Sequence, residues 1–238
     1  MKLSRRQAIR ISCATLAGLS LDRRPAELHA HPGQGAQEPP DALVDTAVRN
    51  IAPLPLLADG SAPEHSSTAA GPISEPTPWR YTGGQTPEID FDYRNLKVKV
   101  DGRRTAKRTG TMRFADLEAL PEHSQVTLLQ CGAPNPRGVV KWTGVRFADL
   151  ADLLEIQPFA HYCRIVASDG YWIEEGIETM RHPQVMLAWK LNDEPLPPKH
   201  GAPLRLVMPF RYGARSLKAV QEIYFTATSF PLPALPAD

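Results

Sequence analysis

The chain has 238 residues, of which 42% are hydrophobic, and a formal net charge of +1. This length is sufficient for one domain with a hydrophobic core, and no apolar run is long enough to span a bilayer. So small a net charge excludes a global field that would attract nucleic acid or an anionic membrane surface.

The first element in chain order is an arginine pair ahead of an apolar stretch. Arg5 and Arg6 precede the apolar residues 11–21, and small residues continue as far as Ala30. This is the layout of a bacterial twin-arginine signal, which directs the export of folded proteins. Residues 1–30 are therefore predicted to be a signal peptide, and the mature protein to be periplasmic. An ordinary secretory signal and an amphipathic tail are the alternatives.

The chain has three cysteines, and Cys13 would be removed with the signal. The other two, Cys131 and Cys163, allow two interpretations. In an oxidising periplasm they could form a single disulfide. Alternatively, one of them could stay reduced and serve as a thiolate metal ligand.

Residues 31–88 are rich in Pro, Ala, Gly and Ser and show little periodicity. Closely spaced prolines, such as Pro39-Pro40 and Pro76-Thr77-Pro78, block regular helices and central strands. This segment is predicted to be a spacer or an extended arm laid over the domain surface. The folded domain is predicted to occupy residues 89–238.

Short strands and a few short helices are predicted within this domain. Residues 95–101 alternate apolar and charged side chains, which is typical of a half-buried strand. Further strands are expected at residues 125–130, 162–167, 185–190, 204–208 and 219–226, with a strand running into a helix at 112–120 and a helix at 147–154. This irregular alternation predicts an α+β domain with mixed sheets rather than a doubly wound parallel fold.

Cys131 follows directly on one of these predicted strands. Gly132, Pro134 and Pro136 then form a rigid turn, so the thiol would be presented at the tip of a framework, as suits a soft metal ligand. A buried or disulfide-bonded cysteine is nevertheless the commoner case. The loop by itself leaves both interpretations open.

A second candidate site lies in residues 199–218, which contain no acidic residue. Glycine and proline in this segment favour exposed backbone N–H groups beside fixed cations, an arrangement that binds a phosphate or a comparable anion. The alternative is that the cations merely border a strand. Nucleic acid is disfavoured because stacking aromatic residues are not interleaved with them. The segment carries His200, Arg205, Arg211, Arg215 and Lys218.

A third candidate is Tyr171, which follows the turn signal Asp169-Gly170. Its hydroxyl could donate a hydrogen bond or a proton to a bound oxyanion. For a lone tyrosine, however, core packing with a satisfied hydroxyl is the default interpretation.

Together these segments resemble the molybdopterin-binding domain of the sulfite oxidase family. The resemblance runs from about Asn95 to Thr226, and its markers keep the family's order. It implies a sulfite oxidase-type molybdopterin-binding fold of the α+β class, with mixed β-sheets and short helices, and a molybdenum-molybdopterin cofactor. The markers are residues 129–131, 142–145, 148–150, 185–192, 194–197, 200–205 and 213–218.

The resemblance also implies roles for single residues. Cys131 matches the cysteine that coordinates molybdenum, and Tyr171 matches the tyrosine that hydrogen-bonds the oxo or substrate oxygen. Arg137 is the candidate for the cation that the family often carries after the cysteine. The positions that hold the pterin and phosphate of the cofactor are matched by His200, Arg205, Arg215, Ser216 and Lys218.

The family's reaction is two-electron oxygen-atom transfer, with electrons passing singly to a haem protein. We therefore expect a molybdopterin-dependent oxidoreductase with a small-molecule substrate and a cytochrome c or membrane cytochrome as electron partner. Nucleic-acid binding is not expected, nor is a membrane span after signal removal. The leading expectation for the substrate is sulfite or a related small oxyanion.

Several departures from the family's pattern affect this expectation. The usual Arg-Asn-His element is missing, with Arg80 as a possible stand-in, and Pro136 separates the cysteine from Arg137. The immunoglobulin-like dimerisation domain and a haem-attachment motif are not seen either. A pocket with fewer cations would bind the sulfite dianion less well.

These departures keep two alternatives open. Residues 196–203 and 208–213 also resemble the catalytic subunit of methionine-sulfoxide reductase, whose substrate is neutral. The non-enzymatic alternative is a cofactor-binding or structural secreted domain without turnover.

Overall fold

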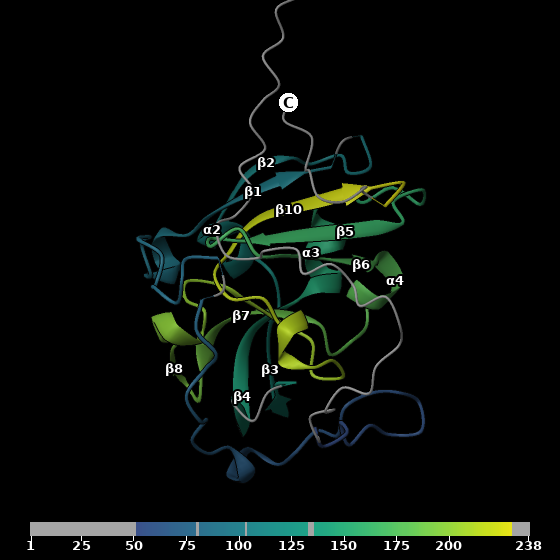
Figure 1. Ribbon diagram of the computed structural model, residues 1–238. Coiled ribbons are helices and arrows are strands. Elements are labelled where there is room, and N and C mark those ends of the chain that lie inside the picture. Colours follow the sequence, from purple (N-terminus) through teal and green to yellow (C-terminus); the bar gives the residue numbers. More distant parts are fainter. Residues whose placement is uncertain (1–50, 80, 103, 133–135, 230–238) are drawn as a thin grey trace, which may run out of the picture. The chain divides into compact units, whose positions relative to one another are not determined.

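The computed structural model describes residues 51–79, 81–102, 104–132 and 136–229 (Figure 1). The predicted signal at residues 1–30, the first part of the predicted arm and Arg80 lie outside these residues. No helix of the described part is long and apolar enough to cross a membrane.

The first sheet has five strands in the order β2-β1-β10-β5-β6. Only β1 and β10 are parallel, and the other neighbours are antiparallel. The alternation predicted for β1 is observed, because Val98 and Val100 are buried while Lys97 and Lys99 are exposed. The strands are β1 (Lys97–Asp101), β2 (Gly110–Arg113), β5 (Tyr162–Ala167), β6 (Trp172–Gly176) and β10 (Val220–Thr226).

The second sheet is antiparallel, in the order β3-β4-β7-β8, with β9 also paired to β7. Its β3 and β4 form a long hairpin whose pairing runs from Glu122↔Val145 to Gln130↔Arg137. Cys131 therefore lies immediately after the last pair, at the end of a rigid ladder. The strands are β3 (Glu122–Gln130), β4 (Arg137–Arg146), β7 (Met186–Leu191), β8 (Glu194–Pro195) and β9 (Arg205–Val207).

The helices are short, as predicted. Helix α3 buries Phe147, Leu150 and Ala151, which lie on one face because they are spaced by three and four residues. The α-helices are α2 (Phe114–Glu118), α3 (Phe147–Leu153) and α4 (Ile177–Met180), and the 3-10 helices are η1 (Ser67–Ala69), η2 (Tyr93–Asn95), η3 (Pro198–His200) and η4 (Gly213–Arg215).

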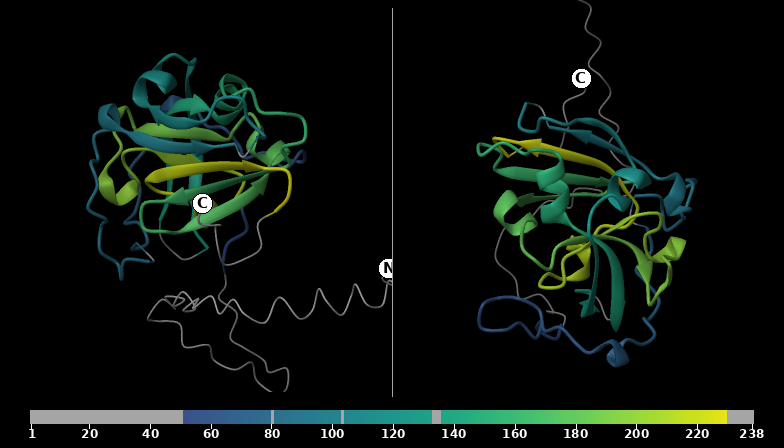
Figure 2. Two further views of the ribbon diagram at one scale, coloured as in Figure 1. Left: turned by 90° about the horizontal axis from the view of Figure 1, so that it is seen from above. Right: turned by 180° about the vertical axis from the view of Figure 1, so that it is seen from behind.

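The main hydrophobic core lies between the two sheets. It joins Val98, Ile165 and Phe225 of the first sheet to Leu187 and Leu206 of the second, and Figure 1 and Figure 2 show the strands of β3 and β4 running across the direction of β10 and β5. The architecture confirms the predicted α+β fold with mixed sheets and short helices.

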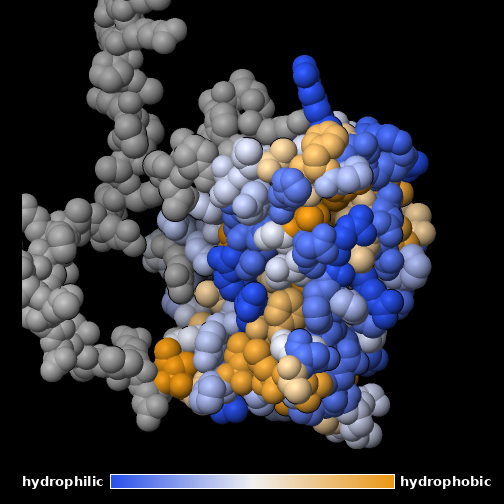
Figure 3. Space-filling model, turned by 90° about the vertical axis from the view of Figure 1, so that its right-hand side faces the viewer, coloured by the Kyte–Doolittle hydropathy of each residue, from blue (hydrophilic) through white to orange (hydrophobic). Residues whose placement is uncertain are grey.

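The described part of the predicted arm is bonded to the second sheet. The His65 N–H donates to the Val126 carbonyl at 2.8 Å, and the Asn192 side chain donates to the Gly71 carbonyl at 2.8 Å. Ile51, Leu56 and Leu57 of this arm keep exposed apolar side chains. Figure 3 shows a face on which polar side chains predominate and apolar ones gather toward the lower edge.

Candidate active site

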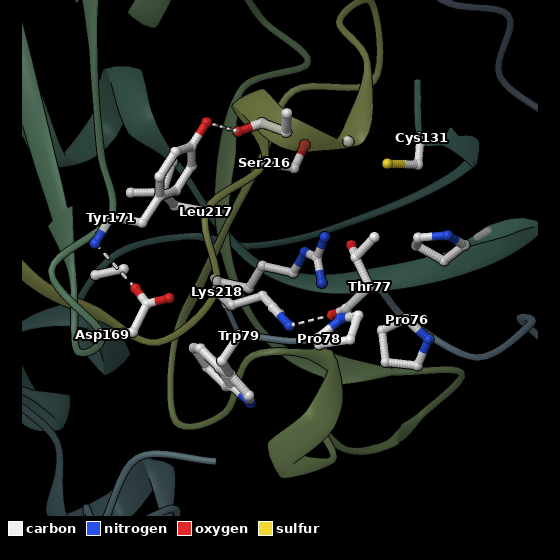
Figure 4. Close-up of a pocket in the computed structure, with 15 residues that line it drawn as sticks. Pro76, Thr77, Pro78, Trp79, Cys131, Asp169, Tyr171, Ser216, Leu217 and Lys218 are labelled. Atoms are coloured by element: carbon white, nitrogen blue, oxygen red, sulfur yellow. Dashed lines mark hydrogen bonds between the residues drawn. The ribbon is translucent and has the colours of Figure 1, made fainter. Parts of the chain in front are cut away.

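A cavity forms where the end of β3 meets the turns after β5 and β9 (Figure 4). Four stretches of chain contribute side chains to its wall. They are a segment that we call the strap (residues 76–79), Cys131 with Pro136, the turn of residues 167–171, and Arg205 together with residues 213–218. The cavity therefore combines residues that are far apart in the sequence.

The Cys131 thiol is buried, with 6% of the residue exposed, and is not in a disulfide. Its N–H donates to the Pro136 carbonyl at 3.0 Å, which closes the turn that the prolines predicted. Cys163 is also a free thiol, but it lies within β5 in the main core, where burial raises the pKa of the thiol well above its ordinary value. Cys131 and Cys163 are thus separate thiols rather than a disulfide, and of these two Cys131 lines the cavity.

Arg205 is a buried cation, with 3% of the residue exposed. Its guanidinium donates to the His200 carbonyl and lies 5.3 Å from the centre of the Trp142 ring. Among the described residues, Nε has no hydrogen-bond partner and no carboxylate forms an ion pair with this side chain. Burial lowers the pKa of Arg205 to about 10, against an opposing effect from Cys131. A buried charge without a counter-ion is costly, so this site favours an anion.

Lys218 is a second cation on the same wall. Its Nζ donates to the Thr77 carbonyl at 3.0 Å and lies 4.2 Å from the centre of the Trp79 ring. Burial lowers the pKa of Lys218 to about 8, and the charge of Arg205 contributes to this shift. Because burial and the charge of Arg205 both disfavour the protonated form of Lys218, an anionic ligand would stabilise it.

His200 and Ser216 complete this region. Burial, followed by the charge of Arg205, lowers the pKa of His200 to about 4, so the imidazole is neutral at neutral pH. Its Nδ1 has no partner among the described residues. A Cβ at Gly201 would lie 2.8 Å from Lys218 Cα, so glycine allows the two turns to approach closely. Ser216 lines the cavity, and its hydroxyl accepts the Met208 N–H at 3.0 Å.

Tyr171 lies on the side of the cavity opposite Cys131, as Figure 4 shows. Its hydroxyl donates to the Ala214 carbonyl at 3.2 Å, and its N–H donates to Asp169 at 3.0 Å. The ring stacks on Tyr81, with 5.9 Å between centroids. The hydroxyl is therefore held beside the cavity rather than inside the core.

Three predicted site residues do not line this cavity: Arg137, Arg215 and His200. Arg137 is exposed at the start of β4, and its N–H donates to the Ser74 hydroxyl at 2.8 Å. Arg215 forms an ion pair with Glu175, with Nε 2.7 Å from the carboxylate. The predicted roles of both arginines remain predictions. His200 also lies outside the wall itself but contacts it through Arg205.

The contact of the strap with Lys218 was not predicted from the sequence. Thr77 and Trp79 hold Lys218. Glu75, just before the strap, forms an exposed ion pair with Lys199 at 2.6 Å. Trp79 is the sequence signal that could have indicated this contact. A large apolar ring in an otherwise proline-rich segment favours burial against the domain over exposure to solvent.

These residues fit an anionic cofactor that carries its own metal ligands. The cavity offers one thiol, two cations that form no ion pair with a described carboxylate, and a neutral imidazole behind them. One acid, Asp169, also lines the cavity and acts on Lys218 at longer range. No group of three or more His, Cys, Asp or Glu among the described residues can hold a metal ion. A metal bound through Cys131 would therefore take its remaining ligands from the cofactor.

One known family matches more than half of the chain. The family described as "Oxidoreductase molybdopterin binding domain" matches residues 83–233. The matched segment includes Cys131, Tyr171, Arg205 and Lys218 but begins after the strap.

Similar proteins include several oxidoreductases. An uncharacterized oxidoreductase of Bacillus subtilis is 31% identical over 118 residues, covering 50% of this chain and 60% of that protein. A protein-methionine-sulfoxide reductase catalytic subunit of Xanthomonas campestris is 29% identical over 144 residues, covering 54% and 44%. The mitochondrial sulfite oxidase of Drosophila melanogaster is 26% identical over 171 residues, covering 60% and 29%. The chain thus spans 29% to 60% of the length of these relatives.

A solved structure shares the fold. The sulfane dehydrogenase SoxCD from Paracoccus pantotrophus superposes with a TM-score of 0.53 at 18% sequence identity. The match covers 59% of this chain and 40% of that chain. At this identity, the likeness describes the fold alone.

Proposed function

The chain belongs to the family of the oxidoreductase molybdopterin-binding domain, and from this premise we propose that it reduces a neutral sulfoxide of the methionine-sulfoxide type. The family's cofactor is molybdenum-molybdopterin. In the proposed reaction the sulfoxide takes up two protons and two electrons, its sulfur–oxygen bond breaks, and a thioether and one water molecule are formed. The similarity to a methionine-sulfoxide reductase subunit supports this substrate class.

The proposal rests on the small number of cations that line the cavity. Arg205 and Lys218 line the wall, and both are assigned to the cofactor's anionic groups. No third cation lines the cavity in the described part of the chain, and Arg137 is exposed outside it. A dianion such as sulfite would therefore meet little compensating charge, whereas a neutral sulfoxide needs none.

The residues divide into two groups by task. Cys131 would bind the metal, while Arg205, Ser216 and Lys218 would hold the pterin and phosphate, with the neutral His200 behind them. When bound, the cofactor supplies the two-electron couple and the metal at which oxygen transfer occurs. Tyr171 would turn its hydroxyl from the Ala214 carbonyl toward the substrate oxygen and donate a hydrogen bond or a proton.

The strap would keep water away from this region. Pro76, Pro78 and Trp79 present apolar surface to the cavity, and Trp79 is itself 4% exposed. Excluding water strengthens the electrostatic interactions of Lys218 and Arg205 with a bound anion. We also propose that the protein is exported through the twin-arginine pathway, which the arginine pair supports. We further propose that a haem protein donates the electrons, which the chemistry of the family supports.

Sulfite oxidation is the second candidate. It is favoured by the similarity to a sulfite oxidase and by the position of Arg137, which begins β4 beyond the turn of Cys131. This activity would require the Arg137 side chain to turn from solvent toward the cavity.

Metal analysis and two assays test the proposal. The full chain, exported by a bacterium that makes molybdopterin, should contain molybdenum and should oxidise a reduced dye when methionine sulfoxide is added. Sulfite should support little reduction of cytochrome c. Efficient sulfite turnover without sulfoxide turnover would favour the second candidate, and protein without molybdenum would overturn both.

A further inference from the structure

The hairpin of β5 and β6 holds the short helix η4 at two points. At the first point, the Tyr171 hydroxyl donates to the Ala214 carbonyl at 3.2 Å. At the second, Arg215 binds the other end of the same hairpin, donating from Nε to Glu175 at 2.7 Å and from Nη2 to the Glu174 carbonyl at 2.6 Å. The first point ties η4 to the turn between β5 and β6, and the second ties it to β6 itself.

The ion pair is well placed to fix geometry. The Glu175 side chain is 12% exposed and that of Arg215 is 36% exposed, so the carboxylate is largely removed from water. Charge-assisted hydrogen bonds to such a group are stronger than neutral ones, and a planar guanidinium fixes direction as well as distance. Losing the cation would leave a largely buried carboxylate without its main partner.

The described backbone hydrogen bonds within the helix η4 itself are few. Its own backbone bonds are Arg215 N–H to the Tyr212 carbonyl at 2.8 Å and Ser216 N–H to the Gly213 carbonyl at 3.1 Å. A single 3-10 turn is intrinsically weak. The residues that follow it, Ser216 to Lys218, form one wall of the cavity. This wall has anchors of its own, because the Met208 N–H donates to the Ser216 hydroxyl at 3.0 Å and the Leu206 N–H donates to the Leu217 carbonyl at 2.9 Å. A movement of η4 would therefore reach the wall first at Ser216, which directly follows η4.

We propose that Glu175 is a positioning residue of the active site, acting through Arg215. Its carboxylate fixes η4, and η4 in turn sets both the direction of the Tyr171 hydroxyl and the position of the Ser216–Lys218 wall. In this proposal Arg215 binds Glu175 and does not bind the phosphate of the cofactor. The part that concerns Tyr171 rests on the proposed function, whereas the part that concerns the wall does not.

Paired substitutions test this inference in the full, molybdenum-loaded chain. Glu175→Gln and Arg215→Gln should each raise amide hydrogen exchange in residues 212–218 by about tenfold, the effect of losing one charge-assisted hydrogen bond. Each should lower kcat for the sulfoxide by about tenfold with little change in KM. The molybdenum content of both variants should stay close to that of the parent. Asp152→Asn is the matched control, because it breaks the Arg181–Asp152 pair of 2.8 Å away from the cavity and should change neither readout.

The charge swap Glu175→Arg with Arg215→Glu provides the decisive comparison. If the pair positions η4, the swap should recover slow exchange and much of the lost kcat. If Arg215 instead holds the cofactor, Arg215→Gln and the swap should lose molybdenum while Glu175→Gln keeps it, which would overturn the inference. Unchanged exchange in both single variants would also overturn it. Arg215→Lys, which keeps the charge, serves if Glu175→Gln fails to fold, and it should show intermediate exchange.

These readouts also separate this inference from the proposed function. Hydrogen exchange and molybdenum content do not depend on the substrate. A chain that turns over no sulfoxide but shows the expected exchange pattern would therefore contradict the proposed function and leave the role of Glu175 in the wall supported.

Discussion

Arg164 in the first sheet and Arg205 in the second occupy similar surroundings with one difference. Both are almost fully buried, at 1% and 3% exposure, and each guanidinium lies over a tryptophan ring, at 4.1 Å and 5.3 Å from its centre. Arg164 forms an ion pair of 3.1 Å with Glu174, whereas no carboxylate of the described residues reaches Arg205. The acid makes the first arginine part of the fold, whereas the second has no such partner and is the one that we propose binds an anion.

A buried cation of the fold can thus be distinguished from one that is available to a ligand. Burial and aromatic stacking do not distinguish the two arginines, and neither does their position within a strand. The counter-charge does, because a buried cation that has no acid gains most from an anionic ligand. Substitutions in the two regions should therefore affect different quantities.

The largest effect is expected at the thiol of the cavity. Cys131→Ser should reduce turnover by more than about 100-fold, because a hydroxyl is a poor substitute for a soft thiolate ligand. The free energy of unfolding should change little, since the substitution removes little volume. Steady-state assays and metal analysis would check this, with Cys163→Ser as a matched control that should keep its molybdenum. Full activity of Cys131→Ser would refute the assignment of the metal ligand.

The next effect tests the structural arginine. Arg164→Met should lower the free energy of unfolding by about 3–5 kcal/mol, because it leaves the carboxylate of Glu174 buried without this cation. Urea denaturation followed by tryptophan fluorescence would measure the change. The double substitution Arg164→Met with Glu174→Leu should recover much of the loss. An Arg164→Met variant as stable as the parent would contradict the structural role of Arg164.

Arg205 should show the reverse pattern, with an effect on cofactor retention rather than on the free energy of unfolding. Arg205→Met should weaken cofactor retention by about 1.5–3 kcal/mol, the value of one charge-assisted contact. The free energy of unfolding of protein made without molybdopterin should stay the same or increase, because an uncompensated buried charge is removed. Molybdenum content after dialysis and urea denaturation provide the two measurements. Destabilisation as large as that of Arg164→Met would mean that both arginines are structural.

The smallest effect concerns pH. Since the pKa of Lys218 is about 8 in the folded protein and about 10.4 in an unfolded chain, the unfolded state binds more protons between these values. The free energy of unfolding of cofactor-free protein should therefore rise with pH across this window, by about 1 kcal/mol after solvent screening. Lys218→Met should remove this slope, and a bound anion should reduce it. An identical slope in Lys218→Met would exclude Lys218 as its origin.

Local patterns in the sequence were sufficient for part of the fold. The strand at Lys97–Asp101 was predicted from its strict alternation, and α3 from the spacing of its apolar residues. The strands β4 and β6 were not predicted. In β4, glycines and a mixed burial pattern obscure the alternation of apolar and polar residues that is typical of a strand. In β6, the adjacent Glu174 and Glu175 suggest a solvent-exposed segment, whereas each of them in fact pairs with an arginine.

The site shows the same division between local and distant contacts. Cys131, Tyr171, Arg205 and Lys218 were singled out from their residue types and turns, and Ser216 from the resemblance to the family. The structure places all five around one cavity. The partners of the cations could not be predicted. Thr77 is 141 residues from Lys218 in the sequence, and Glu175 is 40 residues from Arg215, so only the folded chain reveals which cation is already paired.

The strap has a practical consequence for anyone who shortens this chain. Similarity to the family starts at residue 83, and a truncation designed from that limit would keep every residue of the two sheets. It would nevertheless remove Thr77 and Trp79, which hold Lys218, and open one side of the cavity to water. The shortest chain that preserves the active site is therefore longer at its N-terminus than the shortest chain that preserves the fold.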